Sequence, residues 1–139
     1  MSEDARDCVF CAIVAGDAPA HVIDDDDLTL TFLDIAPLTP GHSLVIPKVH
    51  TDDFWSVDAD TAVAVMRTAR RVADRLRVVL EPDGLNLLQA TRAAGFQTVF
   101  HLHLHVIPRW TDDTMTLPDW PQPPAPPAEL AAMAHRLVS

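Results

Sequence analysis

The chain has 139 residues, 48% of them hydrophobic and 22% charged, which suits one domain with an ordinary buried core. Twenty acidic residues against ten basic ones give a formal net charge of −10. This acidity argues against a nucleic acid duplex or a long single strand as partner, because affinity for a phosphate backbone needs a basic surface. It leaves room for a small phosphorylated substrate in a locally favourable pocket.

Three features of the sequence predict a cytoplasmic protein. The first residues, MSEDARD, are polar and acidic and do not have the build of a signal peptide. No apolar run approaches the length of a membrane span. The two cysteines, Cys8 and Cys11, are too close in sequence to staple the fold, so they indicate a metal half-site or a redox pair rather than a disulfide framework.

Apolar periodicity and turn residues divide the chain into helices and strands. In chain order we expect a short helix within 8–20, strands over 21–23, 28–32 and 43–47, a long helix that Ser56 or Asp58 caps and that ends before Pro82, and strands over 85–90 and 98–107. The remainder, 111–139, is proline-rich and ends in a short helix over 128–138. This order predicts a single α+β domain over 1–139, with its core at about 8–110 and an antiparallel sheet beside one long helix.

The last predicted strand, TVFHLHLHVIPRW, carries His101, His103 and His105 at every second position. Side chains alternate faces along a strand, so the imidazoles are expected on one face, roughly 6.6–7 Å apart, with the strand ending at Pro108. Leu102, Leu104 and Val106 are expected on the opposite face, packed on the core. Three adjacent buried imidazoles are costly unless each has a partner, which favours metal ligation or catalysis over plain packing.

The pair Cys8-x-x-Cys11 is by itself ambiguous between redox chemistry and zinc binding. The redox form usually begins a helix beside a thioredoxin-like βαβ pattern, and that pattern is missing from this sequence. Zinc needs four ligands of the cysteine or histidine type in a tetrahedron.

The run HLHLHVI, from His101 to Ile107, resembles the signature of the histidine triad (HIT) family at all seven of its positions. The segments CVFCAIVAGDAPA, FLDIAPLTPGHSLVIPKVH and FQTVFHLHLHVIPR are similar to the family's segments in order and spacing. The resemblance covers roughly Cys8 to Arg109. It implies a HIT-like fold, in which a five-stranded antiparallel sheet is flanked by one long helix and short N- and C-terminal helices, and a homodimer.

The resemblance also implies a chemistry in which His103 attacks the α-phosphate of a nucleotide and forms a covalent nucleotidyl-imidazole. The substrate would be a nucleoside phosphoramidate or a dinucleoside polyphosphate. A neutral imidazole is a good nucleophile near pH 7, and the pKa of His103 is expected near 6.5 if nothing shifts it. His105, Gln97 and Thr98 are the expected phosphate and leaving-group contacts.

Family resemblance assigns the nucleoside pocket as well. Asp34 is expected to accept the ribose hydroxyls, with a strand-end cap as the alternative. The apolar slot for the base is expected to consist of residues for which core packing is the alternative: Phe32, Ile35, Val9, Phe10, Ile13 and Leu44.

Some family members complete a structural zinc site with histidines at two further positions, which here are His50 and His101. We therefore expect a site made of Cys8, Cys11, His50 and His101 and no organic cofactor. Four protein ligands leave no open position for catalysis. His42 is expected to be a surface or loop histidine rather than a ligand.

The stretch ATRAAGFQ departs from the family pattern. Ala90 stands where a polar amide is common, and Arg92 and Phe96 replace glycines. The altered turn keeps a second reading open, a purine-nucleotide-binding module without turnover. A third reading is a metallohydrolase in which all three triad histidines bind one metal.

Overall fold

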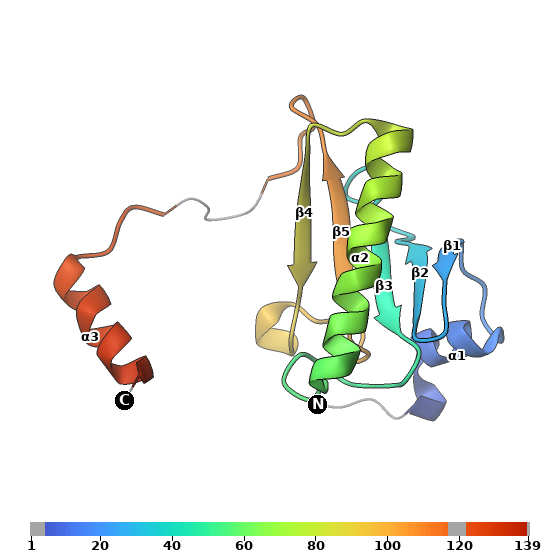
Figure 1. Ribbon diagram of the computed structural model, residues 1–139, viewed down its shortest axis with the longest axis horizontal. Helices are drawn as coiled ribbons and strands as arrows, with labels where there is room; N and C mark the ends of the chain where they lie inside the picture. Colours follow the sequence, from blue (N-terminus) through green and yellow to red (C-terminus); the bar gives the residue numbers. More distant parts are fainter. Residues whose placement is uncertain (1–4, 117–121, 139) are drawn as a thin grey trace.

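A computed structural model describes residues 5–116 and 122–138 (Figure 1). Its centre is one five-stranded antiparallel sheet. In spatial order the strands are β1 (Val22–Asp25), β2 (Thr29–Leu33), β3 (Ser43–Pro47), β5 (Leu104–Arg109) and β4 (Gly84–Gln89). The last strand in sequence therefore lies between β3 and β4. The predicted α+β class, with its five strands, long helix and short terminal helices, is confirmed.

One face of the sheet is covered by the long helix α2 (Ala59–Leu80), which crosses β3 and β5 (Figure 1). The carboxylate of Asp58 caps it by accepting a hydrogen bond of 2.7 Å from the Thr61 N–H, which satisfies one of the free donors of the first turn. The apolar stripe of the helix packs against alternate strand residues to form the first core. Its buried members are Val45, Val65, Ala69, Val72, Leu76, Leu104 and Val106.

The opposite face of the sheet packs against α1 (Val9–Ala15), a short helix that follows a 3-10 turn over Ala5–Asp7. Side chains alternate along β3, so Leu44 and Ile46 point away from α2 and join this second core. The rings of Phe10 and Phe32 meet edge to face there, with 5.3 Å between their centroids. The histidines lie on this face, beside α1.

The prediction of a histidine strand over 98–107 is wrong at both ends. β5 begins at Leu104, so His101 and His103 precede it and only His105 is a strand residue. The preceding segment leaves the sheet because the Leu102 N–H donates to the carbonyl of Thr51 at 2.7 Å rather than to a strand. Pro108 does not end the strand, because β3 pairs with β5 no further than Val106 and no second neighbour needs its missing N–H.

The terminal helix α3 (Pro127–Val138) stands apart from the sheet, beyond the β4 edge (Figure 1). All of its described residues are exposed. Within the described part of the chain, each helix is too short or too polar to cross a membrane.

Candidate functional site

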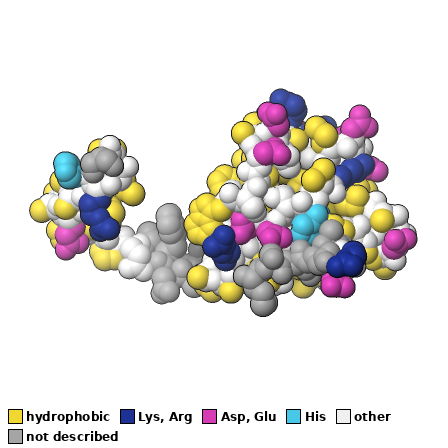
Figure 2. Space-filling model, turned by 90° about the horizontal axis from the view of Figure 1, so that it is seen from below, with side chains coloured by type: hydrophobic (Ala, Val, Ile, Leu, Met, Phe, Trp, Pro, Cys, Tyr) yellow, Lys and Arg dark blue, Asp and Glu magenta, His cyan; other side chains and the backbone are white. Residues whose placement is uncertain are grey.

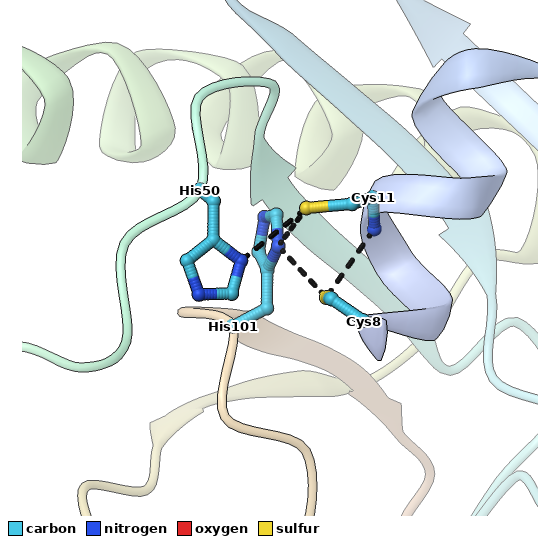
Figure 3. Close-up of side chains that lie close together, drawn as sticks. All are labelled: Cys8, Cys11, His50 and His101. Atoms are coloured by element: carbon cyan, nitrogen blue, oxygen red, sulfur yellow. Dashed lines mark hydrogen bonds between the residues drawn. The ribbon is translucent and has the colours of Figure 1, made fainter. Parts of the chain in front are cut away.

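Two cysteines and two histidines from three parts of the chain meet at the end of the second core (Figure 3). Cys8 is the N-cap of α1 and Cys11 lies in its first turn, while His50 comes from the loop after β3 and His101 from the segment before β5. The Nδ1 atom of His101 is 3.4 Å from Cys8 Sγ and 3.5 Å from Cys11 Sγ, and His50 Nδ1 is 3.3 Å from Cys11 Sγ. A tetrahedral zinc with bonds of ~2.3 Å to sulfur and ~2.0 Å to nitrogen holds such atoms ~3.5 Å apart.

The Nε2 atoms of His50 and His101 point away from the cysteines, and their hydrogen bonds set the tautomer that metal binding requires. His101 Nε2 is 2.8 Å from the carbonyl of Pro47, and His50 Nε2 is 3.0 Å from a carboxylate oxygen of Asp52. Both partners only accept, so each Nε2 carries the proton and each Nδ1 directs its lone pair at the sulfurs. Burial lowers the pKa of His101 to about 4, which keeps the ring neutral. This donor set therefore fits a zinc ion, with its outer hydrogen bonds already in place.

His103 presents one nitrogen for chemistry. Its Nδ1 lies 2.8 Å from the carbonyl of His101 and must donate to it, so the neutral ring carries its lone pair on Nε2. The ring of Phe10 packs edge-on against the imidazole, with 5.2 Å between centroids. Burial lowers the pKa of His103, against smaller opposing effects of this hydrogen bond and of Asp34. The expected pKa of 6.5 is thus corrected downward, and the neutral, nucleophilic form extends to lower pH.

His105 is held in the opposite tautomer by a chain of hydrogen bonds. The backbone N–H of Leu38 donates to His42 Nδ1 at 3.0 Å, so neutral His42 carries its proton on Nε2. That nitrogen is 2.8 Å from His105 Nδ1, which must accept, and His105 is left with a proton on Nε2. Burial, helped by His103 and His42, lowers the pKa of His105 to about 4. The neighbouring rings of His103 and His105, 5.0 Å apart, thus offer a lone pair and a proton.

His42 lies in the loop before β3, as expected, but it is not a surface histidine, since it is only 2% exposed. It directly precedes β3, where Gly41 adopts a φ of +89° that favours glycine. A Cβ at Gly41 would lie 2.5 Å from Leu80 Cδ1, so a larger residue would also force that side chain to shift. No local sequence pattern indicates that His42 is buried. The residue meets His105 only because β3 pairs with β5, and these strands are far apart in sequence.

A second group of possible metal ligands, Asp34, His42 and His105, also lies close together. The same tautomers argue against a metal there. His42 Nε2 carries the proton because Nδ1 faces the Leu38 N–H, so it has no lone pair to give. The two carboxylate oxygens of Asp34 have different neighbours. One accepts from the Ala36 N–H at 2.9 Å, and the other lies 3.5 Å from His42 Nε2. This carboxylate therefore lies beside the imidazoles and also forms the strand-end cap considered above.

The residues assigned to the base slot fall into two groups. Phe10, Phe32 and Leu44 are buried in the second core, and Ile13 packs against it. Phe10 also touches the rings of both His101 and His103, which places this part of the core directly under the triad. Val9 is 48% exposed and Ile35 is 93% exposed, so the core does not enclose these two.

Gln97 lies at the turn that precedes the triad, and its amide is engaged with the backbone. Its Nε2 donates to the carbonyls of Asp52 at 2.6 Å and Val99 at 3.0 Å, and its Oε1 accepts from the Arg92 N–H at 2.6 Å. Gln97 is 4% exposed, so it joins the turn to the His50 loop rather than facing solvent. Thr98 is exposed beside it.

Comparisons with known proteins agree with this arrangement. The HIT domain family matches residues 15–112. Adenosine 5'-monophosphoramidase hnt1 from Schizosaccharomyces pombe is 33% identical over 132 residues, which are 95% of this chain and 96% of that protein. The crystal structure of SMU.412c from Streptococcus mutans UA159 superimposes with a TM-score of 0.91 at 34% identity, over 99% of this chain and 87% of that one.

A Zn-bound histidine triad family protein from Mycobacterium smegmatis superimposes with a TM-score of 0.78 at 40% identity, over 96% of this chain and 99% of that one. These superpositions extend over nearly the whole chain, and the family match spans the sheet and all three histidines. On this evidence the chain belongs to the HIT domain family.

Proposed function

We propose that the protein is a nucleotidyl hydrolase or transferase in which His103 Nε2 attacks the α-phosphate of a nucleoside phosphoramidate or dinucleoside polyphosphate. The observation that carries this proposal is the bond from His103 Nδ1 to the carbonyl of His101, which leaves the Nε2 lone pair free. The similarity to a relative named as an adenosine 5'-monophosphoramidase supports the substrate class.

In the proposed first step a phosphorus–nitrogen bond forms at His103 Nε2 while the bond to the leaving group breaks. His105 Nε2–H is the donor placed beside the nucleophile, and it donates a hydrogen bond to the leaving group or to a phosphate oxygen while keeping its proton. The leaving group takes up any proton that it needs from solvent. Water or another acceptor then displaces the nucleoside monophosphate from His103, restoring the free imidazole. His42 serves as a positioning residue that fixes the tautomer of His105.

Changing His103 to alanine should abolish turnover. Loss of the nucleophile removes the covalent route, so the rate should fall by more than the ~10²–10⁴-fold typical of a missing proton-transfer group. Wild-type protein quenched during turnover should gain the mass of a nucleoside monophosphate on His103, in an acid-labile and alkali-stable linkage. The matched control His21→Ala, at an exposed histidine, should keep full activity.

An adduct on another residue would contradict this mechanism, and so would an active His103→Ala protein. If wild-type protein binds nucleotides but neither turns over nor forms an adduct, the non-catalytic binding module is the correct reading.

We also propose that Cys8, Cys11, His50 and His101 bind a structural zinc ion. The support is the spacing of the four ligand atoms, the two Nδ1 lone pairs that face the sulfurs, and the bond from the Cys11 N–H to Cys8 Sγ at 3.3 Å. Such a bond orients the sulfur of Cys8 as a ligand. When bound, the ion supplies a cross-link between α1, the His50 loop and the triad segment.

Purified protein should therefore contain about one zinc per chain, because four ligands complete one tetrahedral site. Cys8→Ala should lose the metal and melt at a lower temperature, since metal binding contributes to folding free energy and each kcal/mol lost lowers Tm by roughly 2–8 °C. Chelation of the wild-type protein is the control that leaves the side chains intact. Metal-free protein with an unchanged melting temperature would end this proposal.

We propose further that Asp34 accepts the ribose hydroxyls of the nucleotide. Its carboxylate is partly exposed beside His42, and its charge acts on the pKa of His103, so it lies on the catalytic face. A bond from a hydroxyl to a charged acceptor contributes roughly 1.5–3 kcal/mol.

Asp34→Asn should accordingly weaken binding of an adenosine nucleotide by about 10-fold or more, and binding of its 2'-deoxy analogue by less, as measured by calorimetry. Asp17→Asn removes an equal charge at an exposed position outside the site and should change neither affinity. Equal losses for both sugars would show that Asp34 acts only as a cap.

A homodimer joined through β4 is the assembly that we propose. Among the described strands, β4 pairs only with β5, and exposed apolar side chains lie along it at Leu85, Leu87 and Leu88. An unpaired apolar edge is a template for pairing with another chain. The helix α3 lies beyond this edge, and the superposition on the Streptococcus mutans protein, which spans 99% of the chain, includes it (Figure 1).

Sedimentation should find a dimer for the wild-type protein and a monomer for the double variant Leu85→Lys and Leu87→Lys, because lysines on an edge oppose pairing. Leu28→Lys places one lysine on an exposed leucine near the opposite edge and should leave the dimer intact. A monomeric wild-type protein at micromolar concentration would refute the proposal.

A further inference from the structure

The turn between β4 and the triad segment holds two side chains in backbone conformations that favour glycine. Arg92 has φ 64° and ψ 168°, and Phe96 has φ 71° and ψ 24°, on either side of the 3-10 turn Ala93–Gly95. The Arg92 conformation lies in a region that is essentially restricted to glycine. Such strain persists only where the surroundings determine it, and it is concentrated at ligand and catalytic sites.

Three contacts hold Arg92 in place from different sides. Its backbone N–H donates to Gln97 Oε1 at 2.6 Å, and its Nε donates to Asp53 Oδ2 at 3.1 Å. Its guanidinium carbon lies 4.8 Å from the centre of a Trp55 ring. Asp53 is 5% exposed, and its other oxygen accepts from the N–H groups of Trp55 and Ser56, so the carboxylate is itself fixed.

These contacts orient the guanidinium without using all of it. Asp53 binds Nε, and the ring of Trp55 covers one face, while the Arg92 side chain as a whole remains 60% exposed. The two terminal nitrogens are the donors that bind a phosphate in a bidentate manner. The turn thus presents a pre-oriented cation on a backbone that bears a conformational cost.

The turn lies at the triad end of the sheet. The last β4 residue, Gln89, pairs with Leu104, which stands between His103 and His105. Gln97 connects Arg92 to the carbonyl of Asp52, whose side chain accepts from His50, one of the proposed zinc ligands. Figure 2 shows hydrophobic side chains beside a basic one at this lower end of the molecule, with acidic side chains and a histidine nearby.

We propose that Arg92 is a substrate-binding residue that holds an anionic leaving group, the phosphate chain that is displaced from the α-phosphate. This inference rests on the proposed nucleotidyl transfer and names its preferred substrate class, the dinucleoside polyphosphates. In a chain of net charge −10, a departing polyphosphate meets a repulsive field that one fixed cation offsets. The only lysine, Lys48, is 2.6 Å from Asp25 and bound to it. A leaving group that departs as an amine gains nothing from Arg92.

The test is Arg92→Gly, because glycine adopts the required backbone conformation freely and so preserves the turn. Its kcat/KM for diadenosine triphosphate should fall by about 10- to 100-fold, the loss expected for charge-assisted hydrogen bonds. Its kcat/KM for adenosine phosphoramidate should change by less than about 3-fold, since that leaving group carries no phosphate. Arg92→Lys should show a partial loss, and Arg67→Ala, which removes an exposed arginine on α2, should change neither value.

A binding measurement separates this inference from the proposed function. Inorganic tripolyphosphate should raise the melting temperature of wild-type protein more than that of Arg92→Gly, whether or not any substrate is turned over. Turnover without dependence on His103 would defeat the proposed function and leave the tripolyphosphate result to decide on Arg92. Equal responses to tripolyphosphate, or equal losses with both substrates, would overturn the role of Arg92.

Discussion

The site depends on His101, because its ring belongs to the cysteine cluster and its backbone carbonyl orients His103. Its side chain is fully buried, with Nε2 bonded to Pro47 and Nδ1 directed at the cysteines. Its backbone carbonyl accepts from His103 and selects the tautomer of the neighbouring ring. Because one residue serves both clusters, whatever holds the His101 ring also holds the acceptor that orients His103. The proposed zinc ion would in this way stabilise the nucleophile's position without taking part in the chemistry.

A second constraint acts through backbone groups rather than charges. The Leu38 N–H sets the tautomer of His42, which sets that of His105, so His105 presents an Nε2–H beside the Nε2 lone pair of His103. Burial keeps His42, His103 and His105 neutral by lowering the pKa of each ring. The turn at Arg92 differs, because there a charged side chain is held in place by Asp53 on a strained backbone. In the proposed reaction, neutral donors and the fixed Arg92 cation would divide the handling of phosphate in an acidic protein.

Much of this architecture could be predicted from the sequence, because local patterns carry it. The 43–47 strand matched β3 residue for residue, and the long helix has the capping aspartate and the end that its periodicity indicated. The four proposed zinc ligands were brought together as the resemblance implied. The start of β5, the burial of His42 and the engagement of Gln97 were missed, since each follows from contacts between distant segments. The bond from Leu102 to Thr51 and the register of β3 with β5 have no signature in a local pattern.

The central claim is that backbone bonds leave the lone pair of His103 on Nε2 and the proton of His105 on Nε2. Nitrogen-15 NMR of the histidine rings at neutral pH tests it directly, because protonated and unprotonated ring nitrogens have well-separated chemical shifts. The account predicts that His103 carries its proton on Nδ1, while His42 and His105 carry theirs on Nε2. A spectrum with the His103 proton on Nε2, or with a doubly protonated His103 at neutral pH, would contradict it.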